Sequence, residues 1–79
     1  MNRRERRRRI AQRPNAVRLR ELQRLLEDYG WELRRVQGSH YVFRREDDIF
    51  VVPYRRPHLL RVYVLDALKH CQEDAGEEA

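Results

Sequence analysis

The residues best suited to chemistry are Gly38, Ser39 and His40, which directly precede the run Tyr41–Phe43. Histidine exchanges a proton near neutral pH because its unperturbed pKa is about 6.5, so His40 suits a general acid or a general base. The small residues in front of it leave room for a ligand. The alternative is a surface histidine in a hairpin, without a catalytic role.

Gly38 and Ser39 lack bulky side chains, so their backbone N–H groups and the serine hydroxyl are open to a phosphate group. An ordinary hairpin turn is the alternative. His58 is a second candidate, either for the opposite proton transfer or for phosphate binding beside Arg55 and Arg56. For His58 the alternative is capping of the last helix.

Arginines recur in the expected strands and their connections, and the guanidinium fork fits the geometry of a phosphate. These residues are Arg34, Arg35, Arg44, Arg45, Arg55 and Arg56. If the outward members converge around His40, they form a phosphate-binding surface, whereas the alternative is a solvated charged face. Among the aromatic residues Tyr54 is the best candidate for stacking on a base. We expect the others in the core, namely Trp31, Tyr41, Phe43 and Phe50.

Metal and redox chemistry have little support. No carboxylates and histidines stand at ligand spacing, so we expect no metal and no cofactor. The single cysteine, Cys71, leaves no partner for an internal disulfide, fits a reducing cytoplasmic location, and is expected to be a small buried hydrophobe. His70 is expected on the surface near a helix C-terminus. No apolar run approaches the roughly 18 residues that span a bilayer, so we expect no membrane contact.

Charge divides the 79-residue chain into three parts, although its formal net charge is only +5. Residues 1–13 hold seven arginines and one acid, and we expect a basic arm that is disordered or weakly helical when free. Residues 14–72 form one mildly basic domain, and residues 73–79 form a frayed acidic tail. A basic arm on a basic body indicates a polyanionic partner, most often nucleic acid. A solvated arm is the alternative.

Hydrophobic periodicity predicts the order helix, strand, strand, strand, helix. We expect the first helix to begin at Asn15 as N-cap and to end at Gly30. The strands are expected at 31–36, 40–44 and 49–53, and period two places His40 opposite Tyr41 and Phe43. The last helix is expected from about residue 59 or 60 to residue 72, with one apolar row supported by Leu65. That row is Leu60, Val64, Leu68 and Cys71.

The expected fold class is therefore α+β, a three-stranded antiparallel sheet with two helices on one face. Such a sheet buries the apolar side of every element in a chain this short. Its other face stays open for a partner.

Residues 17–72 resemble the HicA family of toxins from type II toxin–antitoxin modules, also called YcfA-like proteins. The motifs that carry the resemblance are Leu25-Leu26, Tyr29-Gly30-Trp31, Gly38-Ser39-His40 before Tyr41-Val42-Phe43, Val51-Val52-Pro53, and Leu65 with Leu68. The chain departs from the family pattern at Tyr54–Leu59, where a Gly-rich or Lys-Gly turn is common. The basic arm also lies outside the family's usual core.

The resemblance implies a fold like that of double-stranded-RNA-binding domains and a ribosome-independent, mRNA-cleaving ribonuclease that needs no metal. It implies that His40 is the catalytic histidine and that a HicB-like antitoxin is the protein partner. Metal-free RNA cleavage needs a group that deprotonates the ribose 2′-hydroxyl and one that protonates the departing 5′-oxygen. Two alternatives stay open: a non-catalytic RNA- or dsRNA-binding module, and an interaction protein that uses its open sheet face. The oligomeric state also stays open.

Overall fold

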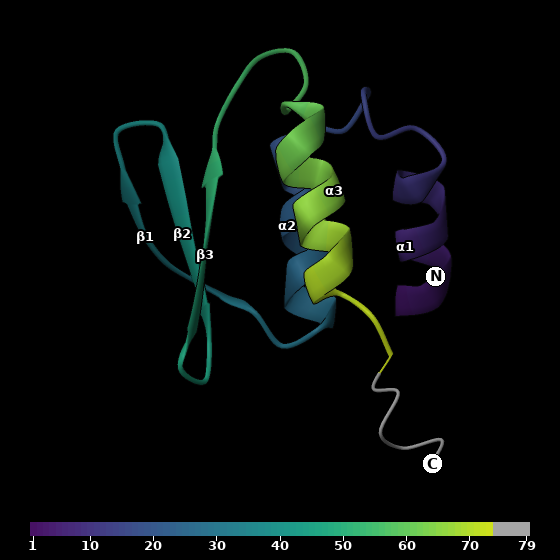
Figure 1. The fold of residues 1–79 in the computed structure, drawn as a ribbon, viewed down its shortest axis with the longest axis horizontal. Helices are drawn as coiled ribbons and strands as arrows, with labels where there is room; N and C mark the ends of the chain where they lie inside the picture. The colour runs from purple at the N-terminus through teal and green to yellow at the C-terminus, as the bar shows by residue number, and fades with distance from the viewer. Residues whose placement is uncertain (74–79) are drawn as a thin grey trace.

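The sheet, two helices and a third helix form three successive layers in a computed structural model that describes residues 1–73 (Figure 1). The elements are α1 (Arg3–Ala11), α2 (Leu19–Asp28), β1 (Glu32–Gln37), β2 (His40–Arg45), β3 (Asp48–Pro53) and α3 (Arg61–His70). The antiparallel sheet has the order β1-β2-β3. Helices α2 and α3 cover one of its faces, and α1 lies on their far side (Figure 1). The predicted α+β class and sheet topology are confirmed.

Helix α1 spans most of the basic arm, which was expected to be disordered or weakly helical when free. Ile10 is only 1% exposed and belongs to the core. Nε of Arg6 lies 2.6 Å from a carboxylate oxygen of Asp28, and Arg7 donates to the carbonyl of Leu68 at 2.9 Å. Asp28 and Leu68 lie at the C-terminal ends of α2 and α3, where unpaired carbonyls and the helix dipole attract cations. The arm is ordered by these distant contacts. Its proposed boundary at residue 13 stays a prediction, and the expected acidic tail lies outside the described residues apart from Glu73.

Helix α2 begins four residues after the expected N-cap, Asn15. The residues in between form a loop, because Val17 is fully buried and its carbonyl accepts a hydrogen bond of 2.8 Å from the backbone N–H of Leu59. The Glu21 carboxylate accepts a bond of 3.1 Å from the backbone N–H of Arg18 at the true helix start. The loop is therefore fixed by the segment before α3, a partner that the local sequence does not reveal.

The helix-covered face of the sheet carries the aromatic core. Phe43 pairs with Phe50 across β2 and β3, and both are buried, as is Trp31. Tyr41 is only half-buried, in contrast to the expectation. Val42, on the open face, is only 9% exposed, because it lies at the middle of the central strand with neighbours on both sides.

The apolar row that leads into α3 begins one residue earlier than expected. Leu60 precedes the helix in an extended conformation and is 43% exposed, whereas Leu59 is buried in its place. Leu65 is also exposed. Val64, Leu68 and Cys71 are buried as predicted, and burial raises the pKa of the Cys71 thiol to about 12. The helix thus packs on the core through its second half more than through its start.

Candidate catalytic end and its basic surroundings

His40 is the first residue of β2, and its exposed side chain lies on the sheet face that no helix covers. Its cross-strand neighbours are Gln37 on β1 and Pro53 on β3. The backbone N–H of Tyr54 donates to the carbonyl of Ser39 at 2.6 Å, so pairing continues past the end of β3. Within residues 1–73 the imidazole has no hydrogen-bond partner, so both of its nitrogens are open to a ligand.

The turn in front of His40 consists of Gly38 and Ser39, the only two residues between β1 and β2. Gly38 has φ +58°, in the left-handed region that glycine enters without a steric penalty. No heavy atom lies within 4 Å of the place where a Cβ of Gly38 would stand. The turn conformation therefore requires the glycine, and the space above it is free for a phosphate group.

The end of the molecule that carries His40 is rich in arginine, whereas the opposite end holds both acidic and basic side chains. The β1–β2 turn, the segment after β3 and the starts of α2 and α3 lie together at this end (Figure 1). Their cations are Arg18, Arg20, Arg55, Arg56 and Arg61. The acids of the other end are Glu27, Asp28, Glu46, Asp47, Asp48 and Glu73. Arginines lie among them, since Arg6 pairs with Asp28 and Arg3 pairs with Glu73. Helix N-termini also carry partial positive charge, so the end with His40 attracts anions.

Arg35 and Arg44 are the predicted arginines that share the open sheet face with His40. Arg35 lies on β1 and pairs with Val42, which stands two residues after His40 on β2. Arg44 lies four residues along β2, roughly 13 Å away at 3.3 Å per residue. Its Nε donates to the carbonyl of Glu46 at 2.7 Å, at the opposite end of the strand from His40. Arg35 is thus the better placed of the two for a ligand at His40.

Arg34, Arg55 and Arg56 are exposed around the same sheet. Arg34 lies at the irregularity in the β1–β2 pairing, 4.0 Å from a carboxylate oxygen of Glu32. Arg55 and Arg56 follow β3, at the end that carries His40. Nε of Arg56 donates to the Tyr54 hydroxyl at 3.1 Å.

His58 is half-buried in the loop between β3 and α3. Within the described part of the chain, no hydrogen bond or ring contact joins it to His40. The structure therefore shows no direct contact between the two histidines. A role for His58 in proton transfer stays a prediction.

Arg45 and His70 are not surface residues at this site. Arg45 lies on the helix side of β2, where its Nη1 donates to the carbonyls of Tyr29 at 3.0 Å and His70 at 3.2 Å. Its guanidinium carbon lies 4.6 Å from the ring centre of Trp31. The ring of His70, expected on the surface, is half-buried 5.6 Å from Trp31 and 5.0 Å from Phe50. Arg45 thus holds the C-terminal ends of α2 and α3 to the sheet.

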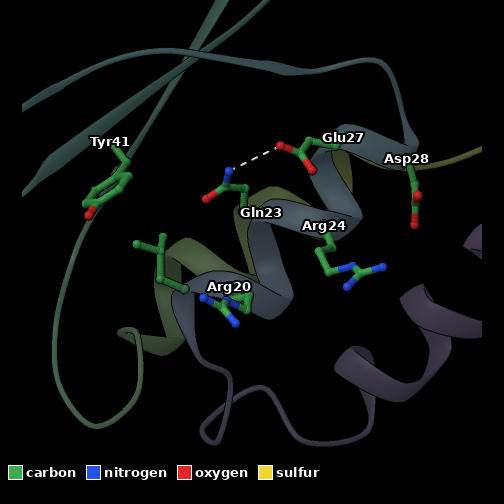
Figure 2. A pocket seen from close by; sticks show the side chains of 7 residues that line it. Arg20, Gln23, Arg24, Glu27, Asp28 and Tyr41 are labelled. Carbon is green, nitrogen blue, oxygen red and sulfur yellow. Dashed lines mark hydrogen bonds between the residues drawn. The ribbon is translucent and has the colours of Figure 1, made fainter.

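A groove of about 640 Å³ opens between the start of α2, the helix side of β2 and the loop after β3. We call it the tyrosine–arginine groove, and its lining residues are Arg18, Leu19, Arg20, Tyr41, Tyr54, Arg56 and Pro57. A second hollow continues it along α2, where Tyr41 lies across from Gln23 and Arg20 (Figure 2). Gln23 is held there by a 3.1 Å hydrogen bond to Glu27.

Sequence reasoning missed most of this groove. It named none of Arg18, Arg20 and Arg24 as a candidate for binding, and it placed Tyr41 in the core. The available signals were the spacing of Arg20 and Arg24, which puts them on one helix face, and the polar tip of a tyrosine at the start of a strand.

Metal-binding clusters and membrane-spanning helices are both absent from the described residues. Across residues 1–73, no three histidine, cysteine, aspartate or glutamate side chains gather where a metal ion could bind. None of the helices in that part of the chain has the length and apolar character needed to cross a membrane.

Comparison with known proteins assigns most of the chain to one protein family. The model of one protein family, described as the HicA toxin of bacterial toxin–antitoxin, matches residues 19–72. The match begins at the first residue of α2 and includes the whole sheet and α3, whereas α1 lies outside it. No curated protein and no solved structure gives a significant match.

Proposed function

Since the chain belongs to the HicA toxin family of bacterial toxin–antitoxin systems, we propose that it is an endoribonuclease that cleaves mRNA in the cytoplasm by acid–base catalysis at His40. The observation that carries this proposal is the position of His40. Its imidazole is exposed and unpartnered on a hairpin end that hydrogen bonds fix in place. The surrounding end of the molecule is basic, so it favours a phosphate near that imidazole.

The chemistry follows from these groups. The scissile phosphate lies over the turn of Gly38 and Ser39, and Arg35 supplies positive charge from the adjacent strand. His40 takes the proton from the ribose 2′-hydroxyl, whose oxygen then attacks the phosphorus. The P–O5′ bond breaks, and the 5′-oxygen leaves with a proton from the imidazolium or from water. The products are a 2′,3′-cyclic phosphate and a 5′-hydroxyl, and no metal takes part.

A HicB-like antitoxin is the proposed protein partner, and the open sheet face is the proposed place of contact. Ile49 and Val51 are exposed apolar residues on that face, beside Arg35 and Arg44. Apolar residues surrounded by cations suit an acidic protein surface with an apolar centre. An antitoxin bound there covers His40 and silences the ribonuclease.

Product analysis tests the proposed chemistry. The purified full chain is incubated in EDTA with an end-labelled single-stranded RNA, and the new termini are identified by mass spectrometry. We expect cyclic phosphate and 5′-hydroxyl ends, and no cut where the 5′ neighbour of the bond is a 2′-deoxynucleotide. Cleavage that stops in EDTA, or that cuts the deoxy-substituted bond equally well, contradicts the proposal.

One observation favours a second function, that of a non-catalytic RNA-binding module with the same basic end. His58 makes no contact with His40, so the described residues hold one proton-transfer group on the open face where two would complete the reaction. This alternative predicts tight, salt-sensitive RNA binding without new RNA ends.

A further inference from the structure

We propose that the tyrosine–arginine groove binds an unpaired nucleotide of the RNA next to the bond at His40, with its base on Tyr54 and its phosphates on the arginines of α2. The proposed function supplies the RNA substrate, and the inference rests on it to that extent. The inference adds a second binding site, on the helix side of the sheet.

The two tyrosines form the aromatic part of the groove. The ring centres of Tyr41 and Tyr54 are 6.1 Å apart, with their planes at 58°. The Tyr54 hydroxyl accepts a hydrogen bond from Arg56, whose guanidinium carbon lies 6.0 Å from the ring centre. These contacts hold the Tyr54 ring in place, yet the residue is 38% exposed. A fixed and partly open aromatic ring is a suitable surface for stacking a base.

The arginines of α2 form the cationic part. Arg18, Arg20 and Arg24 form no ion pair within residues 1–73. Their neighbours in α1 and the following loop differ, because Arg6 is paired with Asp28 and Arg13 with Glu21. Arg18 and Arg20 line the groove, and Arg20 and Arg24 line its continuation along α2. Arginines that form no ion pair can contact the phosphates of a nucleic-acid backbone, although Glu27 and Asp28 also line the continuation of the groove.

The groove is continuous with the catalytic end. Tyr41 directly follows His40 in β2, and the backbone N–H of Tyr54 is bonded to Ser39 in the catalytic turn. An RNA strand that passes over the turn therefore meets Tyr54 next. Only a base outside a duplex can present its face to this ring, since bases in a helix are stacked on one another. The ligand is thus single-stranded RNA.

The test measures RNA binding in the full chain carrying His40→Ala, so that the RNA stays intact. A fluorescein-labelled, single-stranded 12-nucleotide RNA is titrated by anisotropy at several salt concentrations. We expect Tyr54→Leu to weaken binding roughly 5- to 150-fold, because stacking contributes that much per base. Tyr54→Phe keeps the ring and is expected to bind within about twofold of the His40→Ala parent. Circular dichroism verifies that each variant is folded.

A charge-matched pair tests the arginines. Arg20→Gln with Arg24→Gln is expected to reduce the slope of log K against log salt by about 1.4, since each single-strand phosphate contact contributes about 0.7. Arg8→Gln with Lys69→Gln removes two exposed charges outside the groove. That control is expected to leave the slope within about 0.3 of the parent.

Three results would overturn the inference: unchanged binding by Tyr54→Leu, equal loss of slope in both double variants, or duplex RNA that binds as tightly as the single strand. Its failure is distinct from failure of the proposed function. If the unmutated chain cuts RNA but the groove variants bind normally, only the inference fails. If the chain never cuts RNA but the groove variants lose binding, the ribonuclease fails and the groove stands.

Discussion

The backbone N–H of Tyr54 donates a 2.6 Å hydrogen bond to the carbonyl oxygen of Ser39. This bond joins the turn that carries His40 to the segment that carries Arg55 and Arg56. His40, the proposed catalytic residue, and Tyr54, the proposed base-stacking residue, are therefore held close together, although His40 begins β2 and Tyr54 follows the end of β3. A rigid unit of this kind keeps a substrate aligned without a deep cavity.

Arg45 is predicted to be a structural residue. Arg45→Ala removes hydrogen bonds to the carbonyls of Tyr29 and His70 and the contact with Trp31, so we expect the free energy of unfolding to fall by about 2–3 kcal/mol. Urea denaturation measures this change in the free energy of unfolding. The matched control is Arg34→Ala, whose side chain is exposed and 4.0 Å from Glu32, and we expect it to cost less than about 0.5 kcal/mol. Equal effects of the two substitutions would show that Arg45 is not a link between helices and sheet.

Ile10 tests whether α1 belongs to the folded domain. The side chain is buried at 1% exposure, so Ile10→Ala is expected to lower the free energy of unfolding by about 2–4 kcal/mol through the cavity it leaves. Arg9→Ala, at an exposed position one residue earlier, is the control and is expected to change stability little. A negligible effect of Ile10→Ala would instead support an arm that is disordered or weakly helical when free.

Glu21 gives the fold a defined dependence on acid. Hydrogen bonds from the Arg13 side chain and then from the Arg18 backbone lower the pKa of the Glu21 carboxyl from its ordinary 4.5. The unfolded chain therefore takes up a proton at higher pH than the folded chain does. The stabilisation is complete above pH 4.5 and is lost as the pH falls through the lower folded pKa. Thermal melts from pH 6 down to about pH 3 should show a flatter decline for Glu21→Gln than for the parent; identical declines would contradict the prediction.

The exposure of His40 could be predicted because strand alternation places it opposite Phe43, a residue that must be buried. The same alternation puts Arg45 on the helix side with Phe43, so the half-buried position of Arg45 could also have been predicted from the sequence. The position of Leu60 could not be predicted, because a one-residue change in the helix start decides which leucine faces the core. The order of α1 depends on partners such as Asp28 and Leu68, which only the tertiary fold brings near.

The groove was missed for a related reason. On a helix wheel, Arg20 and Arg24 are indistinguishable from a solvated face. Their meaning depends on Tyr41, which lies across the hollow from α2 in a different element (Figure 2). Charge patterns along one segment indicate a partner, but the shape of its site appears only when segments are assembled.

The most direct test of the account is the rate at which His40→Ala cleaves single-stranded RNA in EDTA, relative to the parent chain. Lys69→Gln, at an exposed position outside the groove, is the control. Loss of a proton-transfer group predicts a 10²- to 10⁴-fold lower rate for His40→Ala, with an unchanged circular dichroism spectrum and unfolding midpoint. A folded His40→Ala protein that cleaves RNA at the parental rate would contradict the central role of this histidine.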